Sequence, residues 1–330
     1  MNKYFRIGIS AVLLTFIGWQ TNWSDVGAKF TSLRVELWFA AVAVLMCTQL
    51  FSAKRWQMFT QRLHFPATYW RCTAYYFIGT YFNLLLPTSV GGDVMRVLYL
   101  DNKSGRKLAA LASVFLERLN GLLVLIALAC VGVLVSPLPL PIWIHATVWS
   151  VAGCATLGVL ALPIAATSKW LPDPRRHQLQ TIVGLMKLPR VMTLATAMSI
   201  LVQVFGVISV WLIGQALNLN LPFTYCCILA PMVSLLTLLP ISVNGMGVRE
   251  VGTIVFLAPL GIDADSAKTL AFLWFAVNVA VSLSGGLVYL AGAAPKSNKD
   301  EVSQSPEVND DGSVDRYPDQ GRTGESKAAA

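Results

Sequence analysis

The sequence predicts an all-α, polytopic integral membrane protein. Of its 330 residues, 55% are apolar and only 13% are charged, whereas soluble domains carry about 25% charged residues. Because a helix needs about 20 mostly apolar residues to span the hydrocarbon core, long uncharged stretches indicate spanning helices. Asp, Glu, Lys and Arg are absent from six such stretches: 7–24, 37–53, 72–92, 119–168, 191–248 and 269–295. This composition excludes a soluble globular protein and a largely disordered chain.

The apolar runs differ in what their lengths allow. The first follows Lys3 and Arg6 and resembles a signal peptide, but we favour an uncleaved span. The runs 119–168 and 191–248 are too long for one span, so each must fold back, the first at the prolines of 137–141. We therefore predict about six spans, at about 5–23, 37–53, 109–135, 142–166, 191–216 and 266–292.

The basic residues decide how the remaining run, 72–92, is placed. Lys and Arg gather in 54–71, 96–107 and 169–190, and such clusters mark the cytoplasmic side of a membrane. A full crossing by 72–92 would put two of these basic loops on opposite sides. If 72–92 enters and returns instead, all three basic loops are cytoplasmic together with the N-terminus.

The same argument applies to 223–262, which we predict to enter and return from the outside. The predicted transmembrane domain, 1–295, thus contains two re-entrant hairpins around 72–108 and 223–262; eight spans are the alternative. Residues 296–330 hold five Lys/Arg and eight Asp/Glu, a composition typical of disorder. We expect them to form a cytoplasmic tail of a bacterial inner-membrane protein.

The two hairpin candidates share an internal repeat. Residues 85–96 (LLPTSVGGDVMR) align without a gap with 238–249 (LLPISVNGMGVR), and seven positions are identical. The predicted topology puts the copies on opposite sides of the membrane, as in the inverted repeats of transporters, whose substrate site lies where two broken helices meet. The alternative is a shared helix–turn–helix solution without a role in transport.

Proline and glycine residues in the repeat predict two broken helices. Pro87 and Pro240 should each end an apolar helix, because proline lacks the N–H and disfavours helix in the residue before it. A helix that starts after each break would direct unpaired N–H groups at an anion such as phosphate. Four glycines let the chain turn and approach a ligand closely there: Gly91, Gly92, Gly245 and Gly247.

Charged residues in apolar surroundings are stronger candidates for phosphate binding than the glycines. Arg96 and Arg249 are aligned by the repeat, and a guanidinium binds phosphate through two parallel hydrogen bonds. The alternative for Arg96 is an ordinary cytoplasmic basic residue. Asp93 either caps the helix that carries Arg96 or contacts the ligand.

Two adjacent pairs of opposite charge complete the predicted charge network, Glu117 with Arg118 and Arg249 with Glu250. Neighbouring residues of a helix point about 100° apart, so cross-pairing, for example of Glu117 with Arg249, is expected. Charges inside a membrane are expensive and mark functional sites by default. A purely structural bridge is the alternative.

Other chemistries lack a signal in the sequence. The six cysteines have no CxxC spacing, the three histidines are isolated, and neither a Walker loop nor a nucleophile elbow is present. We expect no metal and no cofactor. The basic and aromatic segment from Lys54 onward indicates an interfacial helix at the inner leaflet and not a nucleic-acid site.

Three motifs together resemble the lysylphosphatidylglycerol synthase transmembrane-region family. They are NLLLPxxxGGDxxR at 83–96, Glu117-Arg118, and PxxxxGxGxRE at 240–250. The resemblance covers about residues 5–292. It implies a lipid translocase fold with re-entrant elements, found also in stand-alone members linked to lysyl-lipid, hopanoid or polyprenyl-glycan pathways. The large soluble domain that transfers lysine in the full synthase is absent here, so we do not expect synthase activity.

We therefore expect a lipid flippase, and not an enzyme, that moves a phosphate-bearing or charged-headgroup lipid. Aminoacyl-phospholipids, polyprenyl-linked lipids and hopanoid-pathway lipids are the candidate substrates. One alternative is an intramembrane lipid-modifying enzyme with Glu117, Glu250 or Asp93 as general base. The other is an accessory subunit of a lipid or glycan synthase, with that enzyme as its partner.

Overall fold

The computed structural model describes Thr15 and residues 33–292, apart from 87–90, 102–104, 169–171 and 240–241. Contacts divide the chain into Met1–Ala294 and Pro295–Ala330, and all described residues belong to the first unit. Every secondary-structure element within the described ranges is helical, with ten α helices and one short 3-10 helix. The predicted span at 5–23, Thr15 excepted, and the predicted tail at 296–330 lie outside the described residues.

Among the residues that the structure describes, five long helices are apolar enough to cross a membrane. Their bounds are Val35–Arg62 (α3), Lys107–Val135 (α6), Ile142–Thr167 (α7), Pro189–Ala216 (α9) and Ala264–Leu290 (α12). The last four begin and end within two residues of the predicted spans. The described part of the chain is thus that of a multi-pass helical membrane protein.

Helix α3 corrects one prediction, because it continues nine residues beyond the predicted end at residue 53. Lys54 and Arg55 therefore extend a long helix and do not start a separate interfacial one. The side chain of Arg55 is buried and pairs with Glu117, which makes its charge tolerable inside the bundle.

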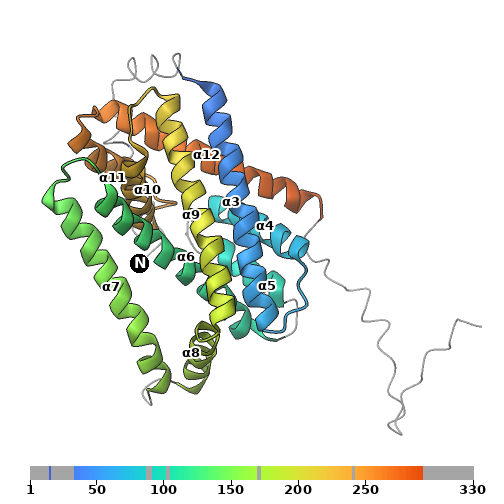
Figure 1. Ribbon diagram of the computed structural model, residues 1–330. Coiled ribbons are helices and arrows are strands. Elements are labelled where there is room, and N and C mark those ends of the chain that lie inside the picture. The colour runs from blue at the N-terminus through green and yellow to red at the C-terminus, as the bar shows by residue number, and fades with distance from the viewer. Residues whose placement is uncertain are drawn as a thin grey trace, which may run out of the picture. The chain divides into compact units, whose positions relative to one another are not determined.

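The long helices pack into a bundle with two apolar cores. Helices α3 and α9 lie side by side, and α12 crosses them obliquely (Figure 1). One core surrounds Tyr225, Leu229 and Leu270, and the other surrounds Trp56 and Phe59. Burial of these side chains fixes the positions of the helices that carry the polar residues described below.

Four shorter helices form two packed pairs. The first short pair is Tyr69–Leu85 (α4) with Gly91–Asp101 (α5), and the second is Phe223–Leu238 (α10) with Val248–Leu257 (α11). At 1.5 Å per residue, even α4 is only about 25 Å long, less than the hydrocarbon core of about 30 Å. A further helix, Asp173–Met186 (α8), packs mainly against α7 and α6.

The first short pair begins and ends at the same end of the bundle. The guanidinium of Arg106, just before α6, donates to the carbonyl oxygens of Leu63 (2.6 Å) and His64 (3.2 Å), just after α3. The same guanidinium lies 4.7 Å from the ring centre of Phe65. The chain therefore enters α4 and leaves α5 beside the end of α3.

The second short pair does the same at the opposite end. The hydroxyl of Tyr225, in the first turn of α10, donates to the carbonyl of Phe256 near the end of α11. The backbone N–H of Arg34 donates to the carbonyl of Ala216 at 3.0 Å, so α3 begins where α9 ends. Since α10 follows α9, this pair joins the bundle at the end where α3 begins.

Helices α4 and α10 end at positions that the sequence repeat aligns, Leu85 and Leu238. The next residues are extended, with ψ of 137° at Leu86 and 131° at Leu239, as residues before a proline usually are. Pro87 and Pro240 themselves lie outside the described residues. After the breaks the copies differ, since α5 begins at Gly91 whereas α11 begins four aligned positions later, at Val248.

Gly92 allows a close approach between α4 and α5. A Cβ at this residue would lie 1.8 Å from the carbonyl oxygen of Gly79. We expect Gly92→Ala to destabilise the protein by about 1–3 kcal/mol, the usual cost of overpacking. Gly153→Ala is the control, because a Cβ there meets nothing within 4 Å. Thermal unfolding in detergent checks this, and equal melting temperatures for the two variants would contradict it.

Candidate functional site

A buried carboxylate joins three helices on one side of the bundle. Glu117, on α6, is 1% exposed. Its Oε2 accepts hydrogen bonds from Arg96 Nη1 (3.2 Å) and Nη2 (3.3 Å) on α5, and its Oε1 accepts from Arg55 on α3. Both arginines are buried, and this carboxylate compensates part of their charge.

A second carboxylate extends this ion cluster. Asp93, in the first turn of α5, accepts hydrogen bonds from Arg118 Nη2 (2.9 Å) and Arg96 Nη1 (3.3 Å). Its Oδ2 also lies 2.8 Å from Arg118 Nε in an ion pair, and hydrogen bonds between charged groups are stronger than those between neutral ones. Three arginines thus face two carboxylates, which leaves the ion cluster (Arg55, Asp93, Arg96, Glu117 and Arg118) with one excess positive charge.

Arg96 is held within the ion cluster. Its guanidinium carbon lies 4.3 Å from the ring centres of both Trp56 and Tyr76, and the residue is 2% exposed. The sequence predicts that Arg96 and Arg249 hold one phosphate between them. In the structure Arg249 lines the cavity described next, whereas Arg96 does not. Arg118, which the sequence assigned to the charge network, is the arginine of the ion cluster that reaches the cavity described next.

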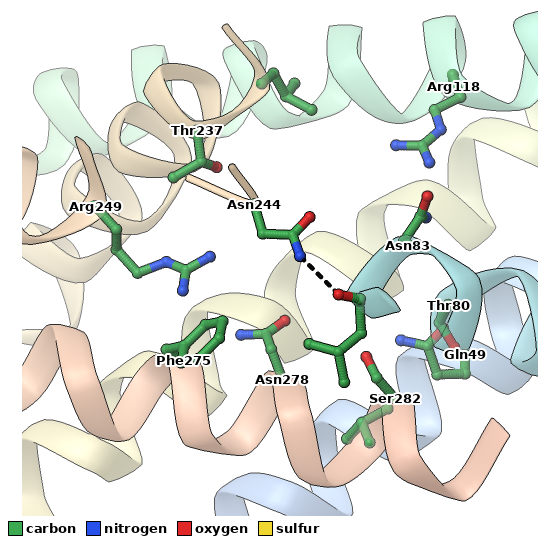
Figure 2. A pocket seen from close by; sticks show the side chains of 13 residues that line it. Gln49, Thr80, Asn83, Arg118, Thr237, Asn244, Arg249, Phe275, Asn278 and Ser282 are labelled. Atoms are coloured by element: carbon green, nitrogen blue, oxygen red, sulfur yellow. Dashed lines mark hydrogen bonds between the residues drawn. The ribbon is translucent and has the colours of Figure 1, made fainter. Parts of the chain in front are cut away.

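A polar cavity of about 240 Å³ lies beside the ion cluster (Figure 2). Helices α3, α4, α6, α10, α11 and α12 all contribute to its wall. None of the described residues that line it is Asp or Glu. Its polar lining is mostly amide and hydroxyl groups with two arginines: Gln49, Thr80, Asn83, Arg118, Thr237, Asn244, Arg249, Asn278 and Ser282.

The segment between α10 and α11 contacts the end of α4 at this cavity. Asn244, between α10 and α11, donates from Nδ2 to the carbonyl oxygen of Leu84 at 3.0 Å, near the end of α4 (Figure 2). Across the first break, Asn83 Oδ1 on α4 accepts from the N–H of Gly92 on α5 at 2.7 Å. The cavity therefore lies where the turn between α10 and α11 contacts the end of α4.

The glycines of the two copies serve different purposes. Gly245 and Gly247 have φ of 73° and 82°, a region that favours glycine, and they form the turn that leads into α11. Gly91 and Gly92 instead belong to α5, and Gly92 permits the contact with α4. The turn predicted for all four glycines is thus observed at the second break.

Arg249 points into the cavity from the first turn of α11 (Figure 2). Its Nη1 atom is buried and has no hydrogen-bond partner among the described residues. Its guanidinium carbon lies 5.3 Å from the ring centre of Phe275 and 5.7 Å from that of Trp274. Aromatic faces attract a cation, but they leave its N–H groups available to an anion.

The expected pairing of Glu117 with Arg249 is wrong, because Glu117 binds Arg55 and Arg96. Glu250 does not neutralise Arg249 through an ion pair either. Its Oε2 accepts from the N–H of Gly247 at 2.6 Å, which caps the start of α11. Within the described ranges, no three His, Cys, Asp or Glu side chains could hold a metal ion together.

Sequence reasoning missed Arg55 and the amides of the cavity. Arg55 lies just beyond an uncharged run, yet it continues a helical spacing of buried residues, Thr48, Ser52 and Phe59, which is the signal that could have found it. Gln49 and Asn278 carry no charge, so a search for charged residues in apolar runs passes over them.

These observations define a class, that of multi-pass helical membrane proteins with a polar cavity at the junction of two broken helices. Residues 4–286 match the model of a protein family described as the lysylphosphatidylglycerol synthase TM region. The chain belongs to this family. No curated protein and no solved structure matches the chain significantly.

Proposed function

We propose that the protein is a lipid flippase that moves a phosphate-bearing or charged-headgroup lipid across the membrane. The headgroup passes through the polar cavity while the acyl chains stay in the bilayer. Aminoacyl-phospholipids, polyprenyl-linked lipids and hopanoid-pathway lipids fall within this class. Family membership supports a lipid-related role.

One observation carries the proposal. A buried guanidinium nitrogen of Arg249 faces a polar cavity without a hydrogen-bond partner among the described residues. An unsatisfied charged group inside a membrane protein is expensive, and a ligand with anionic oxygens would satisfy it. The cavity lies at the meeting point of two broken helices, which is where secondary transporters bind substrate.

The contacts of the three candidate carboxylates favour a transporter over an enzyme that uses one of them as a general base. An intramembrane enzyme would need Asp93, Glu117 or Glu250 as a general base within reach of its substrate. Asp93 and Glu117 bind arginines, and Glu250 caps a helix. All three carboxylates are thus engaged within the protein, and none of them lines the cavity.

We also propose that both short pairs are re-entrant hairpins related as an inverted repeat. The helices of each pair are too short to cross the membrane. Each pair begins and ends at the same end of the bundle, and the two pairs lie at opposite ends. With the basic loops in the cytoplasm, both termini are cytoplasmic and the protein lies in the inner membrane of a bacterium.

Cysteine accessibility tests this topology. Arg62 and Lys107 are exposed residues before and after the first short pair. In a background without the native cysteines, we expect Arg62→Cys and Lys107→Cys to react with a membrane-impermeant maleimide from the cytoplasmic side only. The eight-span alternative predicts that they react from opposite sides.

Filling the cavity tests the transport proposal. Ser282, on α12, lines the cavity, whereas the next residue, Leu283, is 53% exposed on the outer surface. We expect Ser282→Trp to lower the rate of lipid translocation about tenfold or more, because the indole occupies the space that a headgroup needs. The measurement is the loss of fluorescence of an acyl-labelled phospholipid in proteoliposomes after dithionite is added outside.

Leu283→Trp is the matched control and should translocate lipid at the rate of the unmodified protein. Equal rates for both variants and the unmodified protein would mean that the cavity is not the path. A rate no higher than that of protein-free vesicles, for every lipid class named above, would overturn the flippase proposal itself.

A further inference from the structure

Two polar atoms that have no hydrogen-bond partner in the described part of the chain lie on opposite sides of the cavity. Arg249 Nη1 is a positively charged donor, and Gln49 Oε1 is a neutral acceptor. Figure 2 shows Arg249 and Gln49 at the two ends of the group of lining side chains. Buried polar groups in proteins are nearly always hydrogen-bonded, so this pair describes what a bound molecule must offer, an anionic acceptor at one end and a hydrogen-bond donor at the other.

The space between these two atoms suits hydroxyl groups. The polar groups there are the side-chain amides of Asn83, Asn244 and Asn278 and the hydroxyls of Thr80 and Ser282. Amides and hydroxyls both donate and accept, as the hydroxyls of a polyol do. A glycerol or sugar headgroup can therefore be hydrogen-bonded along the cavity without any charge of its own.

The electrostatics of the cavity disfavour a cationic headgroup. Arg249 and Arg118 line it, and none of the described lining residues is acidic. The nearby carboxylate of Asp93 is bound by Arg118 and Arg96, and the ion cluster already has an excess positive charge. An ammonium group in this cavity would lose its hydration, gain no carboxylate and face like charges at close range.

We infer that the cavity selects phospholipids with a net anionic, hydroxyl-bearing headgroup, of which phosphoglycerol is the simplest, over cationic aminoacyl lipids. The phosphate pairs with Arg249, and a headgroup hydroxyl donates to Gln49. This inference rests on the proposed function and narrows its substrate class. It runs against the lipid that the family description names, since a lysyl group adds two ammonium groups to phosphatidylglycerol.

Binding to the purified full-length protein in detergent tests the selectivity apart from transport. The probes are dioctanoyl phosphatidylglycerol, its lysyl ester, and glycerol 3-phosphate, each titrated while the melting temperature is followed. A bound ligand stabilises the folded protein by RT ln(1 + [L]/Kd), so the dependence of the melting temperature on ligand concentration gives the affinity. We expect phosphatidylglycerol to bind about tenfold more tightly than the lysyl ester, because one uncompensated charge contact costs at least about 1.4 kcal/mol.

Variants at the two ends of the cavity sharpen the test. Arg249→Gln should abolish the preference, and Arg249→Lys should keep part of it, because lysine retains the charge without the bidentate donors. Gln49→Glu adds a carboxylate to the cavity and should shift the preference toward the lysyl ester. Arg190→Gln removes an exposed arginine outside the cavity and should leave all affinities unchanged.

The outcomes separate the two proposals. A lysyl ester that binds as tightly as phosphatidylglycerol, or a Gln49→Glu variant without a shifted preference, would overturn the charge selectivity. Glycerol 3-phosphate that binds as tightly as the lipid would show a site for free phosphate esters and overturn the lipid part. Selective binding of phosphatidylglycerol without translocation of any lipid would support the selectivity and refute the flippase function.

Discussion

Replacing Glu117 with glutamine is expected to lower the free energy of unfolding by about 3–5 kcal/mol, the range for removing one partner of a buried ion pair. Glu117 is 1% exposed and binds two buried arginines from different helices. Glutamine keeps the size of the side chain but removes the charge that allows Arg55 and Arg96 to be buried together. Unfolding by denaturing detergent in mixed micelles measures the change.

A double variant distinguishes charge repulsion from lost packing. Arg55→Gln combined with Glu117→Gln removes one charge of each sign, so the ion cluster keeps its net charge. The double variant should therefore be more stable than the sum of the two single effects predicts. If Glu117→Gln unfolded like the unmodified protein, the ion cluster would not hold α3, α5 and α6 together.

The long helices could be predicted because the membrane limits what an uncharged run can do. Backbone groups in lipid must be hydrogen-bonded within the segment, so the run 119–168 had to become two helices joined at 137–141. The observed α6 and α7 follow this rule. The ends of α4 and α10 were also accessible from the sequence, because the aligned Pro87 and Pro240 set them.

The partners of the charged residues could not be predicted, because they depend on tertiary packing. A sequence shows that Glu117 needs a cation, but Arg55, Arg96, Arg118 and Arg249 all qualify until the helices are placed. Arg55 pairs with Glu117 because α3 packs against α6, and no ion pair to Arg249 is present among the described residues. The repeat aligned Arg96 with Arg249, but the helices that carry them begin at different aligned positions.

The uncharged polar residues that line the cavity could not be predicted from the sequence for a different reason. Gln49 and Asn278 lie inside apolar helices, where a single amide barely changes the hydropathy of the helix. Their meaning appears only when three helices and the turn before α11 bring them to one space with Asn83 and Asn244. Uncharged polar residues inside predicted spans are therefore signals of a buried polar cavity that a search for charges alone passes over.

Arg249→Gln is expected to lower the rate of translocation of an anionic phospholipid about tenfold or more, since charge-assisted hydrogen bonds contribute about 1.5–3 kcal/mol. The structure gives Arg249 no ion pair among the described residues, so its loss leaves no carboxylate unpaired. Glutamine retains a donor and fits the same space. The variant should therefore fold normally, with a melting temperature equal to or above that of the unmodified protein.

The most direct test of the cavity as a path for lipid headgroups is the translocation rate of acyl-labelled phosphatidylglycerol in proteoliposomes containing Arg249→Gln or Arg190→Gln. Both variants lose one arginine, but only Arg249 lines the cavity. We predict that Arg190→Gln matches the unmodified protein and that Arg249→Gln falls at least about tenfold at equal melting temperature. Equal rates for the two variants, both above that of protein-free vesicles, would contradict the assignment of the cavity as the path.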